Sequence, residues 1–130
     1  MIDWLKSQPR PAQWIWSSTA KRALATARFV AAGFQLEDEH IIGVDTLYHA
    51  PPDAALDVLR GTPADITSLA IVFHNPGITD LVNLLAGQHV LDNVPTFGIA
   101  QFSTSEVWAY AQPASFKLER VVTPKGVRLL

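Results

Sequence analysis

Residues 68–77, SLAIVFHNPG, decide the fold of this chain. After Ser68, residues 69–73 form an uninterrupted apolar run, which is typical of a strand in a parallel sheet that helices cover on both faces. The turn at residues 74–77, HNPG, then ends the strand and opens a helix over 78–86. The segment therefore predicts an α/β domain with a polar turn at the carboxyl end of a buried strand.

A second strand-to-helix turn lies upstream. Residues 13–17, QWIWS, form a short run of bulky side chains that is typical of a strand. Ser18 or Thr19 is then expected to cap a helix that ends near Gly33. Alanine and other apolar residues recur along this helix at helical spacing, which predicts one buried face.

The other segments complete an α/β pattern over a single domain, residues 1–130. Residues 2–7 read as the last turns of a helix that begins in mid-course, because no capping residue precedes them. We expect a three-layer sandwich with a mixed, mostly parallel sheet. Its remaining elements are predicted to be a helix from the prolines at 51–52 to Gly61 and strands over 40–44, 96–102, 107–111 and 116–122.

The amino-acid composition excludes several classes of function. The chain has 130 residues, 48% of them hydrophobic and 17% charged, which is enough apolar material for a core. A net charge of −2 without a basic run argues against nucleic acid as a partner. The absence of cysteine excludes disulfides, zinc–thiolate sites and cysteine nucleophiles. No segment is apolar for long enough to act as a signal peptide or to span a membrane, so we expect a cytoplasmic domain without cofactor or metal.

Arg22 and His74 are the candidate functional residues. Each lies where a predicted strand ends and a helix begins, and ligands of parallel α/β sheets bind at the carboxyl ends of strands. Helix N-termini present free N–H groups that suit phosphate, and an arginine fork binds phosphate with two hydrogen bonds. The pattern predicts a phosphate pocket, against the alternative that Arg22 is a solvated surface residue and His74 a structural histidine.

Five short motifs, in order along the chain, resemble one family. Residues 17–27, SSTAKRALATA, are similar to Ser-Ser-Pro-Ala-x-Arg-Ala-x-Gln-Thr-Ala, and 47–50, LYHA, resemble Leu-Tyr-x-Ala. Residues 73–77, FHNPG, resemble Gly-His-Asn-Pro-Gly. Residues 93–96, NVPT, and 122–125, VTPK, resemble a late Pro-Thr and a closing Thr-Pro-Lys. This family is the SixA-type phosphohistidine phosphatases of the histidine phosphatase superfamily, which has a phosphoglycerate mutase-like fold.

The resemblance implies a chemistry and a site. Family members attack a phosphoryl group with a first histidine and hydrolyse the resulting phosphohistidine enzyme, while Arg and His side chains disperse the developing charge. By position, Arg22 resembles a phosphate-binding arginine and His74 the second, catalytic histidine, which also contacts the phosphate. The implied substrate is a phosphorylated protein histidine or a small phosphoester. Further residues expected in the pocket are Ser17, Ser18, Asn75 and His49.

The sequence also departs from the family pattern. The nucleophilic histidine, between Arg and Gly at the end of a strand, is expected upstream of residues 2–7, and none of the histidines at positions 40, 49 and 89 has that context. We therefore expect a domain that is incomplete at its N-terminus, lacks its first strand and is inactive as this chain. Phe73 replaces a glycine and Ala25 a glutamine of the pattern. The alternative is a non-catalytic relative that binds anions or proteins, and an exposed sheet edge would favour self-association.

Overall fold

The structure is a computed structural model that describes residues 1–124 and 126–129. The chain forms two compact units, which are described one at a time. The first consists of Met1–Ala50 and Pro63–His74, and the second of Pro51–Thr62 and Asn75–Leu130. That both belong to a single domain stays a prediction.

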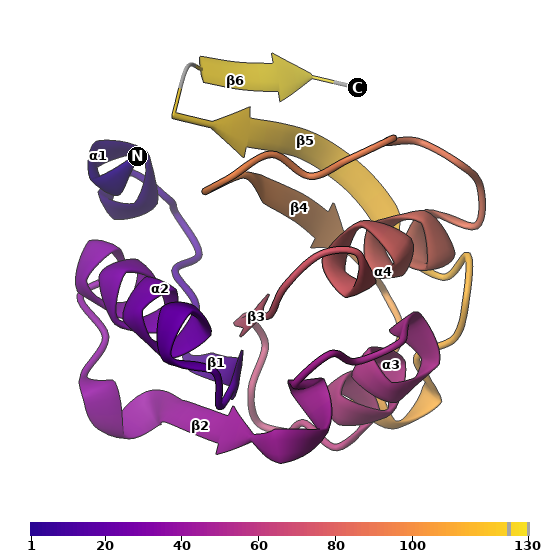
Figure 1. Ribbon diagram of the computed structural model, residues 1–130, viewed down its shortest axis with the longest axis horizontal. Helices are drawn as coiled ribbons and strands as arrows, with labels where there is room; N and C mark the ends of the chain where they lie inside the picture. Colours follow the sequence, from indigo (N-terminus) through magenta and orange to yellow (C-terminus); the bar gives the residue numbers. More distant parts are fainter. Residues whose placement is uncertain (125, 130) are drawn as a thin grey trace. The chain divides into compact units, whose positions relative to one another are not determined.

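The first unit is built on a parallel sheet of three strands in the order β2-β1-β3. Helix α2 lies beside the central strand β1 (Figure 1). Ile15 of this strand is fully buried and packs with Ala27 and Ala31 of α2, so the small side chains of that helix face the sheet. The elements of this unit are α1 (Ile2–Lys6), β1 (Trp14–Ser18), α2 (Lys21–Gly33), the 3-10 turns η1 (Asp38–His40) and η2 (Asp45–Leu47), β2 (Ile41–Val44) and β3 (Leu69–Val72).

Helix α1 packs against the end of α2 through Leu5, which is buried. Gly33 makes this contact close, because a Cβ atom at Gly33 would lie 2.5 Å from Leu5 Cδ1 and 2.7 Å from Leu5 Cβ. The expected helix over 2–7 is confirmed, and it has no side-chain cap at Met1.

The second unit carries an antiparallel sheet in the order β4-β5-β6. Val82 of α4 packs with Leu91, Val94 and the fully buried Val121 of β5, and these residues form the core of the unit. Its elements are α3 (Pro52–Arg60), α4 (Gly77–Ala86), β4 (Ile99–Ser103), the 3-10 turn η3 (Trp108–Tyr110), β5 (Lys117–Thr123) and β6 (Gly126–Leu129).

The α/β class and the parallel sheet are confirmed, as are the three long helices. The antiparallel strands, expected in one mixed sheet, form a hydrogen-bonded sheet of their own. Strand β6 was not predicted, and Lys125 of the Thr-Pro-Lys motif lies outside the described residues. No helix in the described ranges is long and apolar enough to cross a bilayer.

The strand expected over 107–111 is wrong. Residues 108–110 form a 3-10 turn, closed by hydrogen bonds from Tyr110 N to Val107 O and from Ala111 N to Trp108 O, both 3.0 Å. Arg60 Nε donates to Ala111 O at 2.8 Å, which uses a carbonyl that a strand would offer to its neighbour. Local hydrogen bonding therefore overrides the β-propensity of the aromatic side chains.

Candidate functional site

The carboxyl edge of the parallel sheet gathers the candidate residues of the first unit. Ser18 is in register with Val44 of β2, and Ser17 with Val72 of β3, so the three strands end together. Helix α2 begins three residues after β1, and His74 follows β3 by two residues. Topology thus brings Arg22 and His74 to one edge, as predicted from the sequence.

The two serines at the end of β1 are fully buried and satisfied within the turn. Ser17 Oγ donates to the carbonyl of Ser18 at 2.9 Å, and Ser18 Oγ accepts from Ala20 N at 3.2 Å. Ser17 and Ser18, expected as pocket residues, therefore shape the strand-to-helix turn. The N-cap position itself is occupied by Ala20, whose side chain cannot accept a hydrogen bond from the first turn of α2.

Arg22 is the second residue of α2 and is exposed. The first turn of α2 contains no acidic residue. Within the described part of the chain the guanidinium of Arg22 forms no ion pair with a carboxylate. A cation here is unfavourable for the helix dipole, and the uncapped N–H groups of the same turn attract an anion. The start of α2 therefore combines two kinds of donor for one negatively charged group.

His74 is exposed directly beyond the buried Phe73. Phe73, which replaces a glycine of the family pattern, is only 8% exposed and turns its bulk into the interior. The Asn75–Pro76 peptide bond that follows is cis. His74 thus lies exposed at the carboxyl edge, where a ring N–H can donate to a phosphoryl oxygen.

Asn75, expected as a pocket residue, makes hydrogen bonds within the second unit. Its Nδ2 donates to Asn93 Oδ1 at 3.1 Å and to the Val94 carbonyl at 3.0 Å. Its Oδ1 accepts from both the backbone N–H and the hydroxyl of Thr79. A side-chain amide has two donors and two principal acceptor positions, and all are occupied. Within the second unit Asn75 therefore fixes the start of α4 to the loop after it, and its amide has no group left for a ligand.

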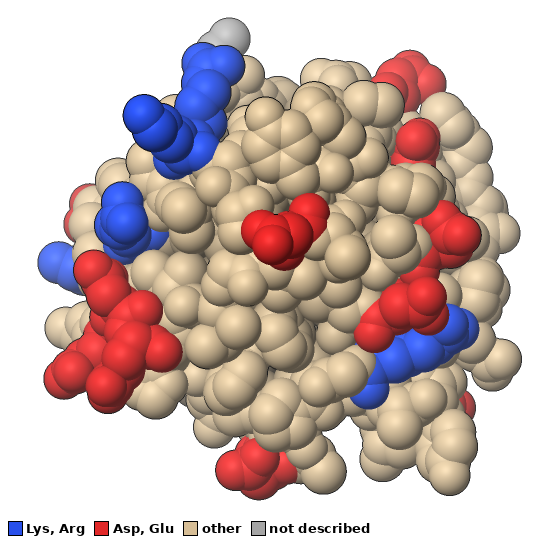
Figure 2. Space-filling model, turned by 60° about the horizontal axis from the view of Figure 1, so that its bottom comes forward, with Lys and Arg blue, Asp and Glu red and all other residues tan. Residues whose placement is uncertain are grey.

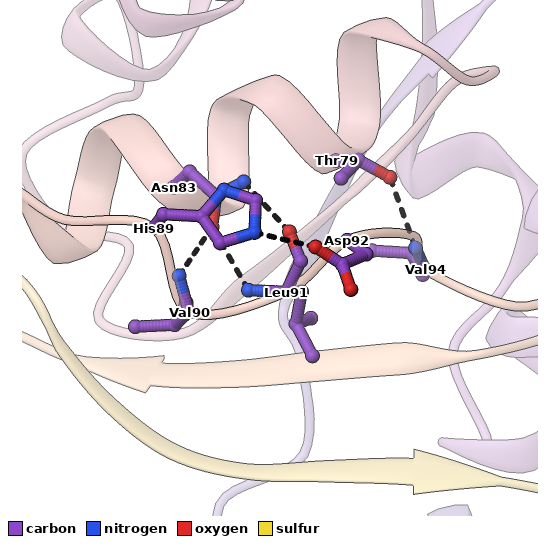
Figure 3. A network of polar contacts seen from close by, with 7 residues as sticks. All are labelled: Thr79, Asn83, His89, Val90, Leu91, Asp92 and Val94. Carbon is purple, nitrogen blue, oxygen red and sulfur yellow. Dashed lines mark hydrogen bonds and ion pairs between the residues drawn. The ribbon is translucent and has the colours of Figure 1, made fainter.

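Two polar residues of α4, Thr79 and Asn83, also bind the loop after the helix (Figure 3). With Asn75 they recur every four residues, and we call these three residues the clamp. Thr79 Oγ1 accepts from Val94 N at 2.9 Å. Asn83 Oδ1 accepts from Val90 N and Leu91 N at 2.8 and 3.1 Å, and its Nδ2 donates to the Leu91 carbonyl at 2.9 Å. The polar residues at positions 75, 79 and 83 were the sequence signal for this clamp, and the motif analysis missed it.

The other histidines are placed as follows. His89 contacts Asp92 at 2.7 Å on the exposed loop after α4, in the second unit (Figure 3). His40 lies 3.8 Å from Glu39 and directly precedes β2, which puts it at the amino edge of the parallel sheet. His49 alone joins His74 at the carboxyl edge, on an exposed turn after η2 beside Tyr48. Sequence reasoning named His49 as a pocket residue and gave Tyr48, which belongs to the motif at 47–50, no role in the pocket.

A shallow hollow of the second unit is lined by other residues than these. It has a volume of about 500 Å³ and is lined by residues 103–105 and 114–117. Glu119 nearby accepts a hydrogen bond from the Ser103 hydroxyl, which lowers the pKa of this carboxyl. The hydroxyls of Thr104 and Ser115 are taken up by backbone carbonyls, so the hollow offers few free polar groups.

The distribution of charged and metal-binding side chains among the described residues does not indicate a second binding site. Most of the face drawn in Figure 2 is uncharged, and its Lys and Arg side chains lie in small groups. In the parts of the chain that the structure describes, no three His, Asp or Glu side chains are arranged to hold a metal ion.

Comparison with known proteins supports the fold. No family model matches the chain. It is 25% identical to the uncharacterized protein ML1117 of Mycobacterium leprae (strain TN) over 130 residues, or 94% of this chain and 78% of that protein.

Two solved structures are similar at a TM-score of 0.76, both candidate phosphohistidine phosphatases SixA. The one from Nakamurella multipartitia shares 22% identity and is matched over 95% of this chain and 77% of its own. The one from Agrobacterium tumefaciens shares 21% identity, with 95% and 75% covered. The chain therefore has the α/β fold of these structures.

Proposed function

We propose that this chain is a SixA-type histidine phosphatase domain that binds a phosphoryl group between Arg22 and His74. The observation that carries the proposal is the register of Ser17 with Val72, which brings the residues following β1 and β3 to one edge. The likeness to two candidate phosphohistidine phosphatases is consistent with it.

Each group has a distinct role in this proposal. Arg22 donates two parallel N–H bonds to two phosphoryl oxygens, and the uncapped amides at the start of α2 donate to the third. His74 donates to an oxygen when protonated. All these donors neutralise charge that grows on the phosphoryl oxygens during transfer, which is how such sites stabilise a transition state. Ser17 and Ser18 support this arrangement from within the fold.

The substrate class follows from the leaving group. We propose a phosphorylated histidine of a protein, with a small phosphoester as the alternative. The first turn of α2, which contains Arg22, offers no acid to protonate an alkoxide, and the acid at this edge, Asp45, lies in η2 beyond the end of β2. An imidazole leaves without such help more readily than an alkoxide does, so phosphohistidine suits this site better.

Turnover needs a histidine held in line with the leaving group. His40 lies at the opposite edge of its sheet, so it cannot share a phosphate with Arg22 and His74. We propose that the 130-residue chain binds the phosphoryl group and does not hydrolyse it. In the family pattern, a strand followed by an Arg-His pair supplies this histidine.

A second candidate function is a non-catalytic binding module, and the two sheets favour it. Strand β3 ends one sheet and β4 ends the other, so each has an outer edge without a strand partner among residues 1–124 and 126–129. An apolar edge strand such as β3, LAIV, readily pairs with another chain. We propose self-association through these edges as the competing role.

Phosphate titration tests the main proposal. The four histidine ring signals are assigned by His→Gln variants and followed by NMR as inorganic phosphate is added. The His74 signal is expected to shift, while those of His40 and His89 stay in place. Arg22→Ala should weaken phosphate binding about tenfold or more, since charge-assisted hydrogen bonds are lost. Arg28→Ala, on an exposed position of the same helix, is the matched control. An unmoved His74 signal would refute the site.

A further inference from the structure

The segment after η2 is a type II turn that displays two rings. Tyr48 has φ −71° and ψ 112°, His49 has φ 56°, and Ala50 N donates to the Leu47 carbonyl at 3.4 Å. These are the angles of the two central residues of a type II turn. Tyr48 and His49 thus occupy the tip of a defined turn that leads from η2 toward α3.

Both ends of this turn are anchored in the interior. Leu47 is fully buried and Ala50 is 5% exposed. Tyr48 between them is 54% exposed, and His49 is exposed as well. Core packing does not explain the exposed rings of Tyr48 and His49, because neither ring contributes to the core.

The backbone at His49 is unfavourable for the residue it carries. The second central position of a type II turn requires positive φ, which favours glycine or asparagine. A histidine with φ 56° is uncommon, and such residues cluster at functional sites. The imidazole stands on the Tyr48 ring edge to face, with centroids 4.5 Å apart and planes at 83°. The turn therefore holds the imidazole in one orientation.

The turn lies at the same edge as the phosphate-binding residues. Val44, the last residue of β2, is in register with Ser18, and η2 follows it directly. Tyr48 comes four residues after the end of β2, just as Arg22 comes four residues after the end of β1. Tyr48 and His49 therefore flank the carboxyl edge of the sheet on the side of β2, and His74 lies on the side of β3.

We propose that Tyr48 and His49 are specificity-determining residues, which contact a planar ring that bears the phosphoryl group. This inference rests on the proposed function. Aromatic and imidazole rings prefer offset-stacked or edge-to-face neighbours, and the exposed Tyr48–His49 pair offers both a ring face and a ring edge. A substrate whose phosphate lies on Arg22 would place its ring against this pair. The site would thus select phosphorylated imidazole or aryl groups over aliphatic phosphoesters.

Two matched ligands test this selectivity. Phenyl phosphate and methyl phosphate carry the same phosphate group and differ in the ring. We expect the full chain to bind phenyl phosphate roughly two- to tenfold more tightly than methyl phosphate, the range that one aromatic contact supplies. Both ligands should move the His74 ring signal, and phenyl phosphate alone should also move that of His49.

Substitutions separate recognition from folding. Tyr48→Ala and His49→Gly should each abolish the preference for phenyl phosphate and leave methyl phosphate binding within twofold. His49→Gly relieves the positive φ, so its melting temperature should be no lower than that of the native chain. Tyr110→Ala removes an aromatic side chain that is 72% exposed in the second unit, and it should change neither affinity.

The outcomes distinguish this inference from the proposed function. Equal affinities for the two ligands in the native chain, or a preference that survives in both Tyr48→Ala and His49→Gly, would overturn the inference and leave the phosphate site standing. Failure of both ligands to bind would overturn the phosphate site and the inference with it.

Discussion

Ser17 and Val72 are register partners on two parallel strands, although 55 positions of sequence separate them. The strand that contains Ser17 leads into α2 and Arg22, and the strand that contains Val72 leads into His74. One backbone pairing therefore brings two distant turns to a common edge. The proposed site depends on this pairing more than on any direct contact between its side chains.

Gly33 is predicted to be required for docking of α1. Gly33→Ala would place a Cβ atom 2.5 Å from Leu5 Cδ1 and 2.7 Å from Leu5 Cβ, so α1 must shift. Overpacking of this kind costs about 1–3 kcal/mol, offset by up to about 1 kcal/mol from the better helix propensity of alanine. A net loss of about 1 kcal/mol in the free energy of unfolding is expected from urea denaturation.

Gly61→Ala provides the matched control for this prediction. The nearest atom to a Cβ at Gly61 is the Val58 carbonyl oxygen, 3.5 Å away, which is an ordinary contact. Its stability should stay within about 0.5 kcal/mol of the native chain, as for substitutions without a special mechanism. Equal effects of the two substitutions would contradict the close contact between α1 and α2.

Asn75→Ala is predicted to destabilise the second unit. The substitution removes four hydrogen bonds and leaves Thr79 N and the Val94 carbonyl without their partner. Since Asn75 is exposed and water can replace part of these bonds, the expected cost is about 1–2 kcal/mol. Asn93→Ala removes only one of the four bonds and should cost less than half as much. Thermal unfolding of the two variants side by side measures the difference.

The elements were largely predictable from the sequence because their patterns are local. The apolar run at 69–72 and the alanine spacing of α2 indicated the correct structures. The 3-10 turn at 108–110 was not predicted, since its own backbone hydrogen bonds and the bond that Ala111 accepts from Arg60, 51 positions away, outweigh the β-propensity of its aromatic residues. Sheet pairing is equally non-local, and for that reason the separate antiparallel sheet was not foreseen.

For the proposed site, the sequence predicted where Arg22 and His74 lie but not the contacts around them. Arg22 and His74 are exposed at the predicted edge, because their place follows from the strand ends alone. The occupation of the Asn75 amide depends on a loop 18 positions away, which no local motif reveals. The exposed turn that carries Tyr48 was not predicted, because a type II turn with histidine at its second central position shows no glycine or asparagine in the sequence.

Self-association is predicted to slow deuterium exchange of the backbone amides at the outer edges of β3 and β4. These edges lack a strand partner within the described residues, so their outward-facing amides should exchange rapidly with deuterium at low protein concentration. Raising the concentration should slow their exchange if a second chain pairs there, while amides of the central strand β1 should be protected throughout. A monodisperse monomer with exchange independent of concentration would contradict the association.

The last prediction concerns turnover. The 130-residue chain should not release phosphate from a phosphohistidine peptide above background, because Arg22 and His74 stabilise charge and neither is expected to attack. Loss of a nucleophile commonly costs several orders of magnitude in rate, since the remaining groups only bind and stabilise. Turnover that disappears in His74→Ala would show instead that this chain holds its own nucleophile. His49 would then be the residue to examine, because it is the other histidine at the carboxyl edge of the parallel sheet. His49→Gln would form no phosphoenzyme if His49 attacks the phosphorus, whereas His89→Gln, at an exposed position where the ring already pairs with Asp92, should leave the rate unchanged.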